Sequence, residues 1–254
     1  MEHSCTRRRL LGAAGKTLLA GVGAAGLLAL PGARPSLAFD WKKLLGEKME
    51  GGFGVVKQLR GSATAGGRAL KEGDRVESGE RVDVAAGSSL ILNMSDRSVF
   101  RFSGPSSLDL LLSMMRRGLL RLLYGGLLAV VPRDNNYLVV GPAGAVGIKG
   151  TVFYREVFPR PGMVGKTMDG TMAVPAGVND HFCNCFGEVA YLGSDEKSEP
   201  FYTDRSTYHH PFFLDPRREN MLVKAPMINH FDDEIERLIG LQQGKKHRAD
   251  WLKL

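Results

Sequence analysis

The residue types that bind transition metals are concentrated in one segment of the sequence. Beyond residue 38 the chain has two cysteines and five histidines, and six of these seven lie within residues 181–230. Thiolate and imidazole are the protein ligands of zinc and copper, whereas calcium and magnesium take oxygen ligands. We therefore expect a zinc or copper site in this segment. Its candidate ligands are Cys183, Cys185, His209, His210 and His230.

The two cysteines lie one residue apart in the stretch HFCNCFG, residues 181–187. If this stretch is a strand, Cys183 and Cys185 point to the same face, with Cα atoms about 6.5 Å apart. That separation is near the upper limit for a disulfide, while two sulfurs bound to one zinc ion approach only to about 3.8 Å. Extended geometry therefore suits a metal clamp better than a bridge. A disulfide and a pair of buried, inert thiols are the alternatives.

The histidines are less specific than the cysteines. His209 and His210 are adjacent, and neighbouring residues rarely bind one ion together, so we expect one ligand and one hydrogen-bonded neighbour. His230 follows Asn229, a candidate helix cap, and can either position the helix start or bind the metal. His181 stands beside an aromatic residue, which indicates a packed strand edge more than a ligand.

No arrangement of residues in the sequence indicates an enzyme. The string GVGAAG, residues 21–26, has no strand before it, and both GKT strings lack the upstream glycine of a phosphate loop. The sequence has no G-x-S-x-G elbow, and no paired carboxylates that would act as acid and base stand near the candidate ligands. The acidic run Asp232–Glu234 suits the positive end of a helix dipole. We expect a non-enzymatic protein, with a metalloenzyme as the less favoured interpretation.

The first 38 residues have the layout of an export signal. Three arginines at positions 7–9 precede a moderately apolar run, Leu18–Leu30, which is followed by a proline and the small-residue pattern SLA at 36–38. Paired arginines directly before two leucines resemble a twin-arginine signal. We expect residues 1–38 to be a twin-arginine-like signal peptide and the protein to be periplasmic. An uncleaved anchor is the alternative, although its apolar run is short of the about 20 residues that a span needs.

The charge of the chain argues against nucleic acid as a partner. The chain carries 34 basic and 27 acidic residues, of which the signal contains five and one. The remainder has 29 basic and 26 acidic residues, a formal charge of +3 in place of +7. We expect no membrane span in the mature chain either, because arginines at positions 116, 117 and 121 interrupt the apolar stretch Leu108–Val131.

Most of the chain after the signal has the pattern of β structure. Residues 39–50 read as an amphipathic lead-in or linker, and residues 51–158 alternate short apolar runs with turn residues. Residues 159–228 read as a loop-rich β extension with the Cys/His cluster, and residues 229–254 as a C-terminal helix and tail. The expected strands are Val55–Leu59, Arg81–Ala85, Ser89–Met94, Val99–Phe102, Leu127–Val131, Tyr137–Val140 and Thr151–Val157.

Three stretches need separate interpretation. The leucine-rich stretch 106–126 is longer than one strand requires, and is either two strands joined near residues 116–118 or an inserted short helix. Residues 159–180 are a loop or a β excursion. In the closing helix we expect Asn229 as the cap, acidic residues in the first turn and an apolar stripe up to Gly244.

Residues 51–158 also carry an ordered set of turn and strand positions. The set comprises Leu70, Gly73, Asp74, Gly79, Leu92, Asp96, Ser98, Gly126, Leu128, Val130, Val146, Gly150, Thr151 and Phe153. The pattern is a leucine then Gly-Asp, a glycine, an apolar strand, an Asp-Ser turn and a closing Gly-Thr-x-Phe. It resembles a FecR-type domain, which implies a small twisted β-solenoid or sandwich-type unit. The glycines and aspartates of the pattern suit corners and turns, so we expect them to be scaffold.

The downstream segment extends this resemblance. HFCNCFGEV, then YHH, then APMINHFDDE before a helix are similar to a subset of exported FecR-like proteins with C-x-C, His-His and Asn-His elements in this order. The similarity implies that the five candidate ligands are shared by that group, without fixing their role. FecR proteins proper regulate iron-transport signalling through a cytoplasmic segment ahead of a membrane span. Here the export signal starts at residue 6, so we do not expect that transmembrane anti-sigma role.

These observations lead to one expected function and one alternative. The first is a non-enzymatic periplasmic FecR-like binding or sensor module that coordinates zinc or copper and acts with an envelope protein partner. The alternative is a cell-envelope structural or interaction module in which a Cys183–Cys185 disulfide fastens a loop. In both, the fold is mainly β, with a C-terminal Cys/His segment and one closing helix.

Overall fold

The described part of the chain is mainly β, as expected from the sequence. The computed structural model describes residues 51–113, 117–160, 162–192, 202–217 and 221–244. The expected signal (1–38), the lead-in (39–50) and the tail beyond residue 244 lie outside these ranges. The mainly β fold with one closing helix is confirmed. Within the described ranges, no helix has the length and hydropathy needed to cross a membrane.

The strands follow one another along the whole described chain. Those up to residue 130 are β1 (Phe53–Arg60), β2 (Ala63–Ala65), β3 (Arg68–Ala69), β4 (Arg75–Glu77), β5 (Arg81–Val84), β6 (Ser89–Met94), β7 (Val99–Ser113) and β8 (Arg117–Val130). The later elements are β9 (Asn136–Gly141), β10 (Gly144–Val157), β11 (Val164–Thr167), β12 (Gly170–Ala173), β13 (Asp180–Leu192), β14 (Tyr202–Ser206), β15 (His210–Leu214), β16 (Leu222–Lys224) and α2 (Asp232–Gln242). Every expected strand is present, and β7, β8 and β10 are longer than expected.

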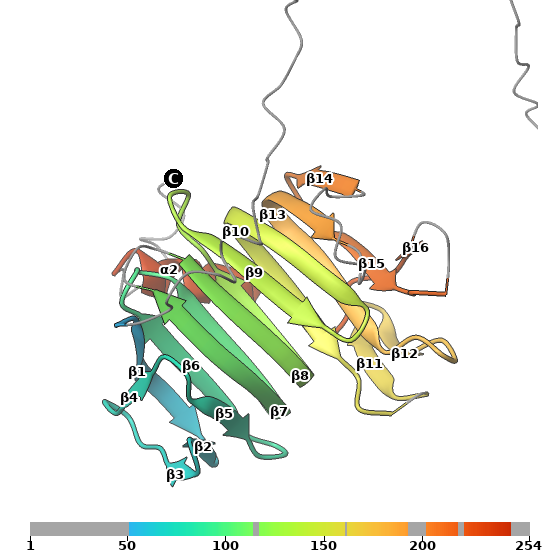
Figure 1. Ribbon diagram of the computed structural model, residues 1–254. Helices are drawn as coiled ribbons and strands as arrows, with labels where there is room; N and C mark the ends of the chain where they lie inside the picture. Colours follow the sequence, from blue (N-terminus) through green and yellow to red (C-terminus); the bar gives the residue numbers. More distant parts are fainter. Residues whose placement is uncertain (1–50, 114–116, 161, 193–201, 218–220, 245–254) are drawn as a thin grey trace, which may run out of the picture. The chain divides into compact units, whose positions relative to one another are not determined.

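Fourteen of the described strands form one large sheet (Figure 1). Its order is β16-β15-β13-β10-β9-β8-β7-β5-β2-β3, with β1, β4 and β6 attached through β7 and β14 through β13. The pairings are antiparallel except for the parallel pair β8–β9. β11 and β12 form a separate hairpin, so the stretch 159–180 contains a β excursion. The finer expectation of a solenoid or sandwich is not confirmed by this open, mixed sheet.

Three long strands bend and change partners partway along their length. β7 pairs with β6 through its first half and with β5 through its second, and its register against β8 shifts between the halves. β8 and β10 likewise pair with each other through one half and with β9 through the other. Gly125 and Gly150 lie at these bends with φ of +92° and +58°. A Cβ there would lie within 2.3 Å of neighbouring atoms, so the bends require glycine.

The leucine-rich stretch forms paired halves of β7 and β8, so the inserted-helix alternative is wrong for the described residues. Leu108 pairs with Leu122, and both side chains are buried. Asp109, which follows, points to the other face and accepts hydrogen bonds from Arg81 at 2.7 Å and Arg121 at 2.8 Å. The apolar residues therefore repeat with the period of two that a strand requires.

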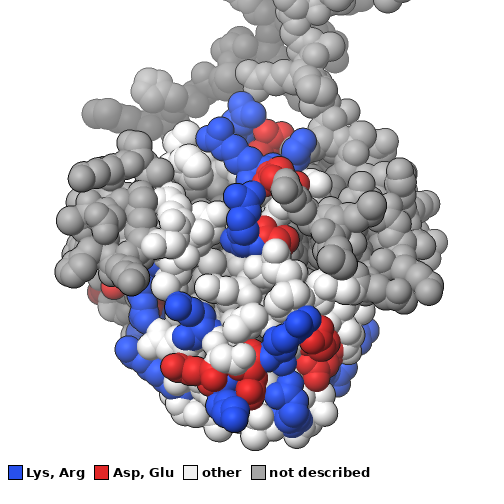
Figure 2. Space-filling model, turned by 90° about the vertical axis from the view of Figure 1, so that its left-hand side faces the viewer, with Lys and Arg blue, Asp and Glu red and all other residues white. Residues whose placement is uncertain are grey.

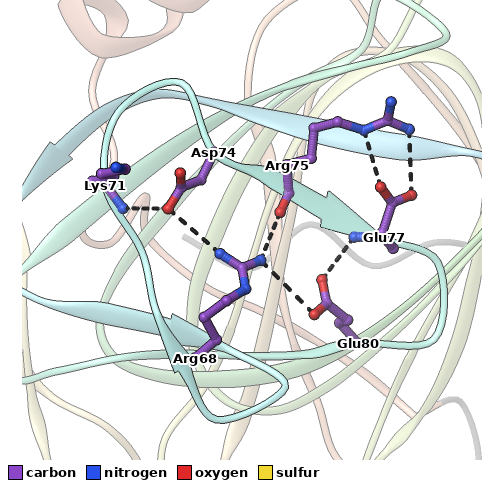
Figure 3. Close-up of polar contacts among 6 residues, drawn as sticks. All are labelled: Arg68, Lys71, Asp74, Arg75, Glu77 and Glu80. Carbon is purple, nitrogen blue, oxygen red and sulfur yellow. Dashed lines mark hydrogen bonds and ion pairs between the residues drawn. The ribbon is translucent and has the colours of Figure 1, made fainter.

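Aspartates of the FecR-like pattern hold turns, as expected. Asp74 Oδ2 accepts a hydrogen bond from the Lys71 amide at 3.0 Å and lies 3.4 Å from the Arg68 guanidinium (Figure 3). Asp96 Oδ1 accepts a hydrogen bond from the Ser98 amide at 2.9 Å. Both carboxylates replace backbone partners that a tight turn leaves unsatisfied, which is a scaffold role.

Charged side chains of both signs interleave on the surface. Figure 2 shows Lys and Arg mixed with Asp and Glu among the described residues of one face. The exposed ion pairs have the same mixed character, such as Arg75 with Glu77 at 3.0 Å and Arg205 with Glu188 at 2.9 Å. Alternating signs cancel at a distance, so the face in Figure 2 does not present the basic stripe that attracts a polyanion.

Helix α2 packs on one face of the sheet. Its buried residues Ile235 and Leu238 contact an apolar group that comprises Ile91, Val99, Leu128, Val130, Val152, Tyr154, Cys183 and Cys185. The N-cap is Phe231 and no side chain caps the helix, so the prediction that Asn229 is the cap is wrong. The Asn229 side chain instead bonds to Lys166 and Glu156.

A buried ion pair joins the start of β13 to β10. Arg155 and Asp180 have side chains with 0% exposure, and the guanidinium donates to both carboxylate oxygens at 3.0 and 2.6 Å. Arg155 also donates to the Val139 carbonyl at 2.6 Å and the Gly144 carbonyl at 2.9 Å. The Ala143 amide donates to Asp180 at 3.3 Å. No local pattern in the sequence predicts this pair, which connects β9, β10 and β13.

We expect Asp180→Ala to destabilise the fold strongly. The substitution leaves a buried guanidinium without a counter-charge, which costs about 3–5 kcal/mol of unfolding free energy. Asp109→Ala, which removes the partner of two half-exposed arginines, is the matched control and should cost only about 1 kcal/mol. Urea unfolding of the two variants measures the difference. Equal losses of unfolding free energy in the two variants would show that the buried pair contributes no more to stability than the exposed one.

Candidate metal centre

Strand β13 brings the two cysteine sulfurs together on the face that α2 covers. Cys183 and Cys185 are both free and buried, and their Sγ atoms are 3.8 Å apart. A disulfide requires a sulfur–sulfur distance of about 2.05 Å, so the two thiols are not bridged. Two sulfurs bound to one tetrahedral zinc ion are about 3.8 Å apart. The observed separation therefore fits the edge of a metal site.

His209 enters the site from the turn before β15. Its backbone amide donates to the Cys185 carbonyl at 3.1 Å, which fixes the residue beside the cysteines. Its Nδ1 lies 3.5 Å from Cys183 Sγ, and its Nε2 donates to Asp232 Oδ1 at 2.8 Å. A sulfur and a nitrogen bound to one tetrahedral zinc ion lie about 3.5 Å apart. Nδ1 is thus placed as a ligand atom.

His230 enters from the segment before α2 and is fully buried. Its Nδ1 lies 2.7 Å from the carbonyl of Ile228, which can only accept, so Nδ1 carries the proton. Its ring stacks on Tyr154 with centroids 4.3 Å apart. Nε2 has no hydrogen-bond partner among the described residues. Leaving the buried lone pair of Nε2 without a partner destabilises the fold, and a metal ion is one partner that this lone pair could bind.

Together these residues form a compact donor set. The ligand atoms of Cys183, Cys185, His209 and His230 all lie within 4.8 Å of one another. Each histidine has its outer nitrogen held by an acceptor, a carboxylate in one case and a backbone carbonyl in the other. That arrangement fixes the tautomer and direction of metal-binding histidines. The group can hold a metal ion.

Cys183, Cys185 and His209 shift one another's pKa values. Burial alone would raise the pKa of Cys183, but the hydrogen bonds with Cys185 and His209 and the proximity of His230 outweigh it, and this pKa lies well below its ordinary value. Burial, followed by the neighbouring Cys183, raises the pKa of Cys185 well above its ordinary value. Burial lowers the pKa of His209, yet the contacts with Cys183 and Asp232 outweigh it and raise this pKa. The lowered pKa of Cys183 favours the thiolate form, which is the form that binds a metal ion.

The structure does not bring His210 to this group. His210 begins β15 opposite Asn184, and its Nδ1 lies 2.6 Å from Asp204 Oδ1. His181 lies on the same side of β13 as the cysteines, but its Nε2 donates to the Pro226 carbonyl at 3.1 Å. Burial lowers the pKa of His181 to about 4, so its ring is neutral.

Sequence reasoning missed Asp232 as part of the site. It assigned the acidic run Asp232–Glu234 to the helix dipole, yet Asp232 accepts hydrogen bonds from His209 and from the Tyr208 hydroxyl. The spacing His230-x-Asp232 is the available signal, because it puts an acid within a turn of a candidate ligand. Tyr154, which stacks on His230, left no such signal.

Comparisons with known proteins give little beyond these observations. No protein-family model and no curated protein matches the sequence. Among solved structures, the chain is similar to a crystal structure of a proposed anti-sigma factor from Parabacteroides distasonis ATCC 8503. The TM-score is 0.42 and the identity 12%, over 57% of this chain and 59% of that one. The chain thus matches less than two thirds of that protein, and the FecR resemblance stays a prediction.

We expect Asp232→Asn to weaken metal binding at this group. Replacing the acceptor of a ligating histidine typically lowers metal affinity 10- to 100-fold. Asp233→Asn, one residue along in the same helical turn, is the matched control, because it removes the same charge from the helix start. Competition with a chromophoric zinc chelator measures both affinities. If the two variants weaken zinc equally, the charge of the turn and not the contact with His209 is responsible.

Proposed function

We propose that this protein is a non-enzymatic metal-binding module that holds zinc through Cys183, Cys185, His209 and His230. The observation that carries the proposal is the donor geometry, with all four ligand atoms within 4.8 Å and each imidazole held from its outer nitrogen. Two thiolates and two imidazoles are a common ligand set of tetrahedral zinc sites, so the donor types favour zinc over copper. Copper(I) is the second metal of this proposal, because thiolates also bind it.

The enclosure of the group supports a structural or sensory role over a catalytic one. Cys183 and His230 have no exposure, Cys185 has 4%, and the His209 side chain has 6%. Four protein ligands fill a tetrahedral shell, and a catalytic zinc site needs an open position for water or substrate. Substrate access to such a site would require the segments that carry the histidines to move.

The position of the group at the start of α2 supports a sensor. His230 lies two residues before the helix, and Asp232, its first residue, holds His209. The rest of the helix is held by a few buried apolar residues, by an ion pair between Arg101 and Glu234 at 2.9 Å and by a hydrogen bond from Arg237 to Gln58. An ion that joins His230 to β13 would therefore add directly to the docking of α2. We propose that the position of α2 reports metal occupancy to a protein partner in the cell envelope.

The periplasmic location is part of this proposal. It is supported by the signal-like layout of residues 1–38 and by the resemblance of residues 51–158 to a FecR-type domain. In an oxidising compartment the two neighbouring thiols are open to oxidation, and occupancy by a metal would protect them. The alternative of an envelope interaction module with a Cys183–Cys185 bridge rests on that same proximity.

Metal content is the first test. We expect protein purified from the periplasm to carry about one zinc per chain by elemental mass spectrometry, and the Cys183→Ser/Cys185→Ser variant to carry none. His210→Ala, which alters the histidine next to a ligand without touching the group, should retain the metal. A metal-free wild type with no free thiols would instead support the bridged interaction module.

The docking of α2 is the second test. We expect removal of zinc by a chelator to speed hydrogen exchange of the α2 amides by about tenfold or more, which corresponds to about 1.4 kcal/mol of lost protection. Strands β2 and β3, at the opposite end of the sheet order from β13 and β15, provide internal control peptides whose exchange should stay constant. Unchanged exchange in α2, with zinc bound stoichiometrically beforehand, would contradict the sensor role while leaving metal binding intact.

A further inference from the structure

We infer that Asn229 is a positioning residue of the metal centre: it holds the segment 228–230 so that His230 Nε2 faces the two sulfurs. This inference rests on the proposed metal binding, and it assigns a role to a residue that touches no ligand atom directly.

The backbone at Asn229 has an unusual conformation. Its φ is +56°, in the left-handed region that non-glycine residues rarely adopt and that asparagine tolerates best. His230 follows immediately, and the His230 ring turns back so that Nδ1 meets the carbonyl of Ile228. The left-handed residue thus lies between the ligand and the carbonyl that orients that ligand.

The Asn229 side chain and backbone are held by three hydrogen bonds to two different elements. Its amide donates to the Lys166 carbonyl at 2.9 Å, and its Oδ1 accepts from the Lys166 amide at 2.7 Å. Its Nδ2 donates to Glu156 Oε2 at 2.7 Å. The first two bonds tie the residue to β11, and the third ties it to β10. One carboxamide is needed to accept on one side and donate on the other.

The neighbouring residue is fixed by packing against the same strand. Ile228 is fully buried, and its Cγ2 lies 2.1 Å from the place where a Cβ on Gly165 would be. The chain at 228 therefore approaches β11 as closely as glycine permits. Glu156 also accepts a hydrogen bond from the hydroxyl of Tyr154, whose ring carries the imidazole of His230. The Glu156 carboxylate therefore binds both Asn229, which precedes His230 in the chain, and Tyr154, which stacks on the His230 ring.

The helix itself does not account for Asn229. Helix α2 begins at Asp232 and its cap is Phe231, so Asn229 lies outside the cap box and bonds to no helix amide. Its hydrogen bonds all go to β10 and β11, and none goes to α2. A residue whose only role was to start the helix would bond to helix amides and not to Lys166 and Glu156.

The test compares Asn229→Gly with Asn229→Asp in the full exported chain. Glycine keeps the left-handed backbone and removes both side-chain bonds, whereas aspartate keeps the acceptor for Lys166 and loses the donor to Glu156. We expect the zinc dissociation constant, measured by chelator competition, to rise 10- to 100-fold in both. Met221→Gly, at another left-handed position outside the group, is the matched control and should leave the constant unchanged.

Spectroscopy separates positioning from stability. Cobalt(II) substituted for zinc reports the ligand set through its visible absorption bands, and His230→Ala gives the reference spectrum for a site without that imidazole. We expect Asn229→Gly to shift toward this reference spectrum under conditions where urea unfolding shows it to be fully folded. A purely structural role would lower the unfolding midpoint but leave the cobalt spectrum and the zinc constant of the folded protein as in wild type.

The outcomes also distinguish this inference from the proposed function. Zinc binding by wild type together with unchanged constants in both Asn229 variants would overturn the positioning role alone. A wild-type protein that takes up neither zinc nor cobalt would overturn the metal-binding proposal, and the role of Asn229 with it.

Discussion

The placement of the Cys/His group depends on the buried ion pair between Arg155 and Asp180. Asp180 is the first residue of β13, and its carboxylate is fixed by a guanidinium that also binds two carbonyls. Because side chains on a strand alternate, fixing residue 180 also fixes which residues of β13 face α2. A shift of one residue in the register of β13 against β10 would turn both sulfurs to the opposite face of the sheet, away from His209 and His230.

The same alternation separates two histidines that are adjacent in sequence. Asn184 faces away from the cysteines, and its register partner His210 lies with it beside the buried carboxylate of Asp204. His209 precedes the strand, with φ of +20°, and lies on the cysteine side. The two imidazoles therefore have different partners, and only one of them meets a sulfur. The register of β15 against β13 therefore determines that His209, and not His210, is available to an ion.

This dependence explains what the sequence could and could not predict. Strands such as Ser89–Met94 and the shared face of Cys183 and Cys185 follow from local alternation, and local patterns predicted them correctly. The choice between His209 and His210 depends on the register of β15 against β13, which no local pattern contains. The partner changes of β7, β8 and β10 likewise arise from contacts between distant residues. Asn229 fits the pattern of a cap, and only its tertiary bonds to Lys166 and Glu156 show otherwise.

The Cys/His group contains several features that destabilise a fold. His230 buries an imidazole nitrogen without a partner among the described residues, which costs about 1–3 kcal/mol. His209 and Asn229 both hold left-handed backbone, each at a cost of about 1–3 kcal/mol. A Cys183–Cys185 bridge would relieve none of these, because it gives His230 Nε2 no partner and leaves His209 without its sulfur contact. A cation bound by all four donors would give the orphaned nitrogen and both sulfurs a partner at once, which is why the proposed function assigns the group to a metal ion.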